Sequence, residues 1–246
     1  MKLSVIICCY NEKATIRDII GKTKAVELGP RWDREIIVVD NFSTDGTREI
    51  LEQIDDPEIR VVFHDRNMGK GMSIRTGIAN MNGDYMIIQD ADAEYDPAEH
   101  TAFCQKADET AAAAIFGSRV LAGDIRYKYT HAYLGVRVLT IATNILFGGK
   151  LTDVATASKM VRADVVQSLN LTTKDFNLDF ELPNKILLAG YKIIEIPISY
   201  NPRTYEEGKK ITSIDGFKAI LIMIRDRLGL SPVLKKGISA SKSASS

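Results

Sequence analysis

The chain of 246 residues lacks several features that would place a protein in a class at once. It has 32 basic and 32 acidic residues, and this balance gives no reason to expect nucleic acid as a partner. Its three cysteines and three histidines follow no metal-ligand spacing. Because an odd number of cysteines without a disulfide framework is typical of a reducing compartment, we expect a cytoplasmic location.

Long apolar runs are also missing. A spanning helix needs roughly 18 to 20 apolar residues in succession, and no stretch of this chain meets that requirement. The first apolar run ends at Asn11 and Glu12, which argues against a signal peptide. Hydrophobic residues nevertheless make up 45% of the chain, enough for the core of a large α/β domain.

Short apolar runs alternate with helix-like segments through the first half of the chain. We expect strands over Leu3–Cys9, Glu35–Asp40, Ile59–His64, Asp84–Asp90 and Ala113–Gly117. We expect helices over Ala14–Leu28, Thr44–Ile54 and Gly69–Met81, and another that is capped by Asp96 and begins at Pro97. This alternation predicts an α/β fold with a mostly parallel central sheet flanked by helices, and a site at the carboxyl ends of the strands.

The most informative motif is Asp90-Ala91-Asp92, which follows the apolar run Tyr85–Ile88. Residues two apart in an extended strand point to the same side. The carboxylates of Asp90 and Asp92 can therefore converge on one hard cation such as Mg²⁺ or Mn²⁺. An Asp-x-Asp pair is common in solvated turns, so its position after a buried strand is what favours a metal site.

Polar side chains follow each of the five expected strands. In chain order they are Tyr10 with Glu12, Asp40, Lys70, Asp90 with Asp92 and Glu94, and Arg119. Any one of them is explained equally well as part of a capped turn. Asp40, for example, could cap the next helix, although Ser43 also suits that role. Five such groups at one edge of a sheet favour a single polar site.

Two glycine-rich phosphate-binding patterns are absent. The dinucleotide-binding pattern places glycines after the first strand, and the segment from Leu3 to Glu12 contains none. The Walker A pattern is missing as well. Gly69-Lys70-Gly71 lets the backbone approach a ligand and supplies one positive charge. The sequence therefore favours a phosphate held by a metal ion over one held in a glycine-rich cradle.

Four motifs together resemble the family 2 glycosyltransferases. They are Val5–Glu12, Val38–Thr47, Asn67-x-Gly69-Lys70-Gly71 and Gln89–Pro97. Later segments resemble the branch of dolichyl-phosphate mannose and glucose synthases and their bacterial polyprenyl-phosphate relatives. These segments are Phe116–Arg119, Leu151–Asp153, Ser158–Lys159 and Glu195–Ile211. The resemblance extends in order over roughly residues 1–230.

This resemblance implies a nucleotide-diphospho-sugar transferase fold of the GT-A type. It also implies that a hexose is transferred with inversion from a UDP- or GDP-linked sugar. It assigns Tyr10, Glu12 and Asp40 to the nucleoside pocket, Lys70 and Asp90 to the ribose and diphosphate, and Asp92, Glu94 and Asp90 to Mg²⁺ or Mn²⁺. Asn41 stands where the family commonly has an aspartate, and Cys8 where it commonly has a proline.

The resemblance further implies one glycosyltransferase domain over residues 1–230. Its nucleotide-sugar half would cover 1–120 and its acceptor half 121–230. Residues 231–246 follow as a tail, and the Ser/Ala/Lys-rich composition at the end of the chain is typical of disorder.

The chemistry of the acceptor determines which other residues are needed. A lipid monophosphate is a ready nucleophile near neutral pH and needs only cations to position it. Arg119, Arg126 and Arg203 are the candidate cations. A sugar or protein hydroxyl would instead require a carboxylate base, for which Asp179 and Glu181 are the candidates. Both acids are explained equally well as residues at the N-terminus of a helix.

The C-terminal third contains two segments with an apolar face, Val136–Phe147 and Ser213–Leu230. Nearby lysines and arginines, among them Lys209 and Lys210, make the second segment suitable for an anionic membrane surface. Packing on the core, or against a second copy in a homo-oligomer, explains the same pattern. We expect a nucleotide sugar, a lipid phosphate and a peripheral membrane contact as partners. A sugar-nucleotide-binding protein without turnover is a further alternative, and the intact Lys70 and Asp92 argue against it.

Overall fold

The computed structural model describes residues 1–123, 130–203 and 213–230. The predicted tail at 231–246 lies outside the described residues, and so do Arg126, Lys209 and Lys210.

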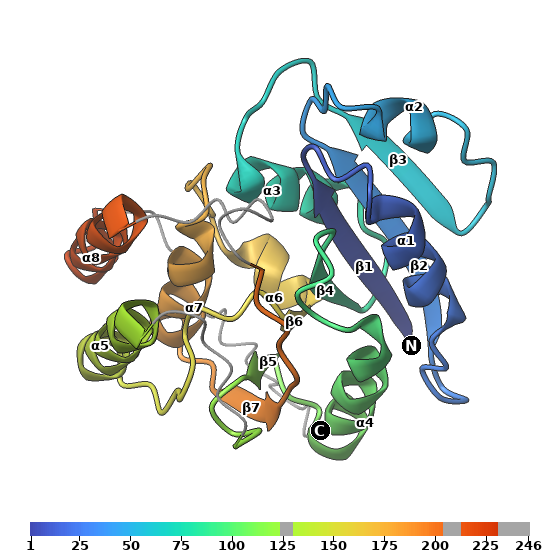
Figure 1. The fold of residues 1–246 in the computed structure, drawn as a ribbon. Helices are drawn as coiled ribbons and strands as arrows, with labels where there is room; N and C mark the ends of the chain where they lie inside the picture. Colours follow the sequence, from blue (N-terminus) through green and yellow to red (C-terminus); the bar gives the residue numbers. More distant parts are fainter. Residues whose placement is uncertain (124–129, 204–212, 231–246) are drawn as a thin grey trace, which may run out of the picture.

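Seven strands form one sheet in the described part of the chain. They are β1 (Lys2–Cys9), β2 (Asp33–Asp40), β3 (Ile59–Phe63), β4 (Tyr85–Asp90), β5 (Ala114–Ser118), β6 (Lys159–Arg162) and β7 (Ile193–Pro197). Their order is β3-β2-β1-β4-β6-β5-β7, and β6 alone among these strands runs antiparallel to its neighbours. The predicted α/β fold with a mostly parallel sheet is confirmed, and the sheet continues through both predicted halves (Figure 1).

Helices cover both faces of this sheet (Figure 1). They are α1 (Ile16–Ala25), α2 (Thr47–Leu51), α3 (Lys70–Asn80), the 3-10 turn η1 (Pro97–Glu99), α4 (His100–Thr110), α5 (Thr130–Phe147), α6 (Ala163–Ser168), α7 (Leu178–Leu188) and α8 (Ser213–Arg227). Side chains from α1 and α4 form a core on one face of the sheet, and side chains from α3, α6 and α7 form a core on the other. Because strand residues alternate between faces, Val5 and Ile7 enter the first core and Ile6 enters the second.

The register of the parallel strands gathers their carboxyl ends at one edge. Cys9 at the end of β1 is level with Asp40 at the end of β2. Cys8 is level with Asp90 at the end of β4. Loops that are distant in sequence therefore leave the sheet side by side, as expected for a site in an open α/β sheet.

The helices α1, α2 and α3 are shorter than predicted at both ends. Asp96 accepts from the Ala98 amide at 3.0 Å, which confirms the predicted cap ahead of Pro97. The helix expected from Thr44 begins instead at Thr47. Asp45 accepts from the Thr47 amide at 3.0 Å, and this bond closes a turn where the helix was expected.

Two helices, α5 and α8, lie together on the outer side of α7, away from β1–β3 (Figure 1). Each exposes large apolar side chains, which are Leu134, Val138, Ile141 and Ile145 on α5, and Phe217, Ile220, Leu221 and Ile224 on α8, with Leu228 directly after it. We call these residues the outer apolar face. Within the described ranges, no helix combines the length and the apolar character that crossing a bilayer requires.

Candidate active site

A cavity of about 250 Å³ opens at the carboxyl ends of β1, β2 and β4. Its walls come from six separate segments of the chain. The lining residues are Cys8, Cys9, Tyr10, Glu12, Asn41, Asn67, Gly69, Lys70, Ser73, Asp90, Ala91, Asp92, Glu94, Phe176 and Arg203. Most of the residues predicted for a sugar nucleotide and its metal are thus brought together in one place.

The loops around this cavity contain strained backbone. Asn11, Phe42 and Ala93 have φ angles of 56°, 68° and 61°, in the left-handed region that residues other than glycine seldom adopt. Asn11 helps to hold two of these loops together, because its side-chain oxygen accepts from the Thr44 amide at 2.8 Å. Such strain persists only where surrounding contacts fix the loop, and it is concentrated at functional sites.

Lys70 and Asp90 form the innermost ion pair of the cavity. Nζ of Lys70 lies 2.8 Å from Oδ1 of Asp90 and 3.7 Å from Oδ2 of Asp179. Burial disfavours the charged lysine, but Asp179 and Asp90 outweigh it and raise the pKa of Lys70. Lys70 is therefore a permanent cation at the start of α3, where backbone amides also favour an anion.

Arg203 crosses the opposite side of the cavity. Its guanidinium makes two 3.1 Å hydrogen bonds to the carboxylate of Glu12, and its Nη2 lies 2.9 Å from Oδ2 of Asp92. Burial disfavours the charged form of Arg203, but the carboxylates of Glu12 and Asp92 outweigh this effect and raise the pKa of Arg203 above its ordinary value. One arginine therefore joins a residue predicted for the nucleoside to a residue predicted for the metal.

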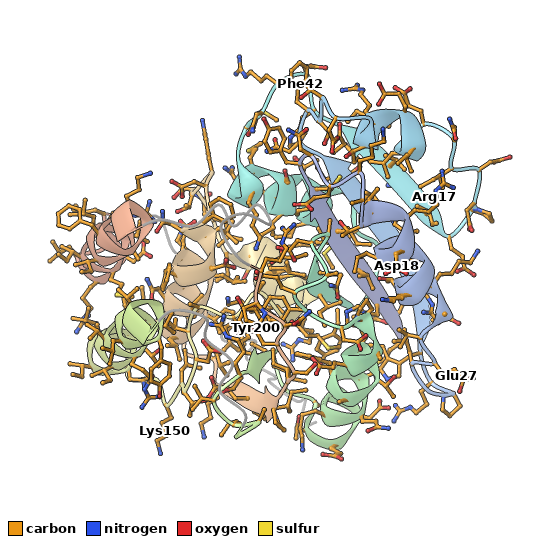
Figure 2. The ribbon with its side chains drawn as sticks, viewed as in Figure 1. Arg17, Asp18, Glu27, Phe42, Lys150 and Tyr200 are labelled. Atoms are coloured by element: carbon orange, nitrogen blue, oxygen red, sulfur yellow. The ribbon has the colours of Figure 1, made fainter. Side chains whose placement is uncertain are left out.

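Glu94 holds the segment that carries Arg203. Its carboxylate accepts from the hydroxyl of Tyr200 at 3.0 Å and from the backbone amide of Arg203 at 2.8 Å. Figure 2 shows Tyr200 among the packed side chains in the middle of the molecule. The side chain of Glu94 is thus directed to residues 200–203, and the structure does not group it with Asp90 and Asp92 around one point. Among the described residues, no three His, Cys, Asp or Glu side chains form a metal-binding group.

Asp90 and Asp92 nevertheless fit a divalent cation. Burial raises the pKa of Asp90 to about 6; Lys70 opposes this effect, and Asp92 adds to it. Burial and the charge of Glu94 likewise raise the pKa of Asp92. Carboxylate oxygens are the donors that Mg²⁺ and Mn²⁺ prefer, and a divalent cation here would favour the ionised form of both groups.

Asp40 lies behind the cavity wall. It is fully buried, and its two oxygens accept from the Ser43 amide at 3.2 and 3.3 Å. The carboxylate therefore closes the turn after β2, close to the capping role that the sequence left open. The next residue, Asn41, lines the cavity in its place. A contact between Asp40 and a nucleoside remains a prediction.

The geometry does not support the predicted role of Arg119 in binding an acceptor phosphate. Its guanidinium makes bonds of 2.6 and 2.7 Å to Asp153, and Nη1 donates to the hydroxyl of Tyr95 at 3.3 Å. It also stacks over the ring of Tyr200, 4.9 Å from the ring centroid. Arg119 is 6% exposed, so this buried cation joins β5 to the loop around Asp153.

Glu181 does not fit the role of a catalytic base either. It is fully buried, and burial alone would favour its neutral form. The hydrogen bonds of Lys185, Thr172 and Thr173 outweigh this effect and lower the pKa of Glu181 to about 2. A base needs a pKa near the operating pH. The second candidate, Asp179, is engaged by two lysines, with Oδ2 3.7 Å from Lys70 and Oδ1 3.5 Å from Lys159.

Several cavity residues were not predicted as site residues. Cys8, which stands where the family commonly has a proline, is half-buried, packs against the core and also lines the cavity. Phe176 precedes α7, and no sequence pattern connects it with the strand ends. Asn41 and Asn67 had a detectable signal, because both follow strands. Asn41 Nδ2 donates to Asn67 Oδ1 at 2.8 Å, which joins their two loops.

The curated relatives include the undecaprenyl-phosphate 4-deoxy-4-formamido-L-arabinose transferases of Salmonella paratyphi A and Salmonella dublin. Each is 34% identical over 113 residues, and the match covers 44% of this chain and 34% of the relative. The chain therefore aligns with about a third of the length of these relatives.

Solved structures share the fold over almost the whole chain. Glucosyl-3-phosphoglycerate synthase from Mycobacterium tuberculosis, with Mn²⁺, UDP-glucose and phosphoglyceric acid, has a TM-score of 0.64 at 18% identity and covers 96% of this chain and 81% of its own. TarS of S. aureus, in complex with UDP-GlcNAc, has a TM-score of 0.60 at 15% identity and covers 96% and 68%. At these identities the likeness establishes the fold, which is of the predicted GT-A type.

Residues 4–169 match the model of the family described as glycosyl transferase family 2. This range includes every motif from β1 to Lys159 on which the predicted resemblance rests, and covers well over half of the chain. The chain belongs to the family 2 glycosyltransferases.

Proposed function

We propose that this chain transfers a hexose, with inversion, from a UDP- or GDP-linked sugar to a polyprenyl phosphate. The observation that carries the proposal is the pairing of charges in one cavity, where the carboxylates of Asp90 and Asp92 lie beside the cations Lys70 and Arg203. The printed names of the curated relatives, which are undecaprenyl-phosphate transferases, support the choice of acceptor.

The donor would occupy the wall formed by β1, β2 and α3. Tyr10 and Glu12 would line the nucleoside pocket, with Asp40 behind it. Lys70 would hold the diphosphate, because it is a buried cation at a helix N-terminus. Asp92, together with Asp90, would hold Mg²⁺ or Mn²⁺, which stabilises the negative charge that builds on the departing diphosphate.

Arg203 would position the acceptor. A lipid phosphate carries its own negative charge and needs no base, and an arginine side chain matches its oxygens with paired donors. The geometry favours this route over transfer to a hydroxyl, because neither predicted base is available. Glu181 is buried in hydrogen bonds, and Asp179 is engaged by Lys70 and Lys159.

The acceptor would be met at the cytoplasmic face of a membrane. The outer apolar face of α5 and α8 supports this part of the proposal, because it groups large apolar side chains at the surface. Lys218 and Arg227 on α8 are exposed and add positive charge suited to anionic lipids.

A thermal-shift panel of UDP- and GDP-sugars, with and without Mn²⁺, tests the donor half of the proposal. A ligand that binds only the native state raises the melting temperature by mass action. We expect a sugar nucleotide with one of the two bases to raise it, and the rise to be larger with Mn²⁺.

The matched control is Asp92→Asn, which keeps the shape of the side chain and removes its charge. Its melting temperature without ligand should stay close to that of the wild type, and the additional rise with Mn²⁺ should be lost. If Mn²⁺ adds as much to the Asn variant as to the wild type, Asp92 does not hold the metal.

A further inference from the structure

The buried carboxylate of Glu181 joins helix α8 to a distant loop. On one side it accepts from the backbone amides of Thr172 and Thr173 at 3.0 and 2.8 Å. On the other side its Oε1 lies 2.9 Å from Nη2 of Arg225 on α8. Lys185, one turn further along α7 at 2.8 Å, balances its charge. A carboxylate with this many partners fixes the position of each of them.

The segment that Glu181 holds, residues 172–176, packs on the start of α3. The amide of Met72 donates to the carbonyl of Lys174 at 3.0 Å. A Cβ added to Gly71 would lie 2.7 Å from a backbone oxygen of this segment, which is closer than real Cβ atoms come. The two backbones are therefore in direct contact, and a shift of one must move the other.

Both partners in this contact place a side chain in the cavity. Phe176 ends the segment and lines the cavity wall. Nζ of Lys70, at the start of α3, lies 5.9 Å from the centroid of the Phe176 ring and 2.8 Å from Asp90. A continuous set of contacts therefore connects α8 with the ion pair that Lys70 and Asp90 form in the cavity.

A second contact between α8 and the same segment supports this connection. Nζ of Lys218 lies 3.6 Å from Oδ2 of Asp175. Helix α8 thus reaches residues 172–176 directly through Lys218 and indirectly through Arg225 and Glu181.

We infer that Glu181 is a positioning residue for the donor side of the site, and that α8 sets the placement of Lys70 and Phe176 through it. The inference rests on the proposed function, because it takes a nucleoside diphosphate as the ligand of Lys70.

The test removes the α8 contact and measures donor binding without any acceptor. Arg225→Ala should weaken the affinity for UDP or GDP, measured by calorimetry with Mg²⁺, by about fivefold, the change that a coupling of about 1 kcal/mol produces. Arg225→Lys keeps the charge and should restore part of this loss. Arg227→Ala, an exposed change on the same helix, should bind as the wild type does.

Hydrogen exchange supplies a readout that does not depend on the ligand. Arg225→Ala should speed exchange in residues 68–74 and leave β5 unchanged, whereas a general loss of stability would affect both. Glu181→Gln should reproduce the effect on affinity and exchange.

The inference is overturned if Arg225→Ala and Glu181→Gln both bind the nucleotide as the wild type does and exchange at residues 68–74 stays the same. If the wild type binds neither UDP nor GDP, the proposed function fails, and the exchange measurement alone then decides the inference.

Discussion

At the scale of single residues, the site consists of half-buried acids that each have a basic or polar partner. Asp90 has Lys70, Asp92 has Arg203, and Glu94 has the backbone of residues 200–203. A buried charge without a partner costs several kcal/mol. Lys70 and Arg203 offset part of this cost for Asp90 and Asp92, although burial still raises the pKa of both carboxyls.

Substitution of Arg203 best distinguishes an effect on the acceptor from an effect on the sugar-nucleotide donor. Arg203→Ala should raise the KM for a polyprenyl phosphate, lower kcat, or both, with about a tenfold or larger loss in kcat/KM for a charge-assisted contact of about 1.5 to 3 kcal/mol. Steady-state kinetics measure this loss, and calorimetry measures binding of the sugar nucleotide without acceptor, which should change less. An equal loss for both substrates would show that Arg203 serves the donor.

His100 fixes the loop that follows β4, although it does not line the cavity. Its Nε2 lies 3.0 Å from Oε1 of Gln89. The Gln89 amide group in turn donates to the carbonyl oxygens of Asp90 and Tyr95, at 3.0 and 3.2 Å. The imidazole that suits this arrangement is neutral, with its proton on Nε2.

This imidazole predicts an acid-sensitive stability. Burial, assisted by Arg34 and opposed by Asp96, lowers the pKa of His100 from 6.5 to about 4. Above pH 6.5 the group is neutral in both states. Below it, the unfolded chain binds a proton that the folded chain excludes, so the free energy of unfolding falls, by about 3 kcal/mol once the pH reaches 4.

Denaturant unfolding between pH 7 and 4 measures this effect, with His100→Gln as the control without a titrating ring. Other groups titrate in both proteins, so the comparison isolates His100. Between pH 7 and 4, the free energy of unfolding of the Gln variant should fall by about 3 kcal/mol less than that of the wild type. If the free energy of unfolding falls equally with pH in both proteins, the titration of His100 does not cause the acid sensitivity.

The sequence indicates residues well where a strand end dictates their direction. Asp90 and Asp92 follow a buried run, and both reach the cavity as predicted. The predicted roles of Arg119 and Glu181 were not supported. The sequence pattern around a charged residue does not reveal whether its side chain contacts a ligand or a buried partner. Asp153, the partner of Arg119, lies 34 residues away in the chain, and no local pattern reveals that pairing.

At the scale of elements, the five strands of the first half were predicted almost residue by residue, because each is an apolar run bounded by turn residues. The antiparallel β6 was not predicted. It has four residues, and the pattern of Lys159–Arg162 does not reveal which way it runs. Its place between β4 and β5 is set by tertiary pairing with both neighbours.

The contact between α3 and residues 172–176 makes glycine necessary at the start of α3. Gly71→Ala would put a Cβ 2.7 and 2.8 Å from the carbonyl oxygens of Asp175 and Thr173. Backbone must then move, and we expect a loss of about 1 to 3 kcal/mol in the free energy of unfolding. Urea titration measures this loss. Gly21→Ala, where a Cβ would meet no atom within 4 Å, is the matched control and should lose no stability.

The outer apolar face belongs to two helices and is tested at that scale. Leu221→Asp combined with Ile224→Asp should reduce binding to anionic vesicles by about tenfold or more, because two apolar side chains no longer enter the lipid. Flotation with vesicles measures binding. Both side chains are exposed, so the melting temperature should stay the same.

Phe42→Asp is the control for this pair. Phe42 is also exposed, and it lies at the edge of the molecule beside α2, away from α8 (Figure 2). Its vesicle binding should match that of the wild type. If the variant of α8 floats as well as the control, the face contacts something other than lipid, and the second copy considered from the sequence becomes the partner to test.

At the scale of the whole molecule, one sheet would join the proposed donor wall to the proposed acceptor side. The proposed donor wall comes from β1, β2 and α3, which lie within the part of the chain that matches the family model. Arg203 reaches the cavity from beyond that part, and α8 contacts Glu181, which holds the segment that packs on α3. The two substrates would therefore approach from different sides and meet where Arg203 lies beside Asp92.

The central claim is that the acceptor is a lipid phosphate. Its most direct test is transfer of radiolabelled hexose, from the UDP- or GDP-sugar that binds, to a short prenyl phosphate, the matched prenyl alcohol and a soluble glycan. The account predicts label on the prenyl phosphate, and little on the alcohol or the glycan, because Arg203 and Lys70 suit an anionic acceptor and both predicted bases, Asp179 and Glu181, are held by other side chains. Equal transfer to the alcohol or the glycan would contradict the account, and Asp179 would then be the base to test.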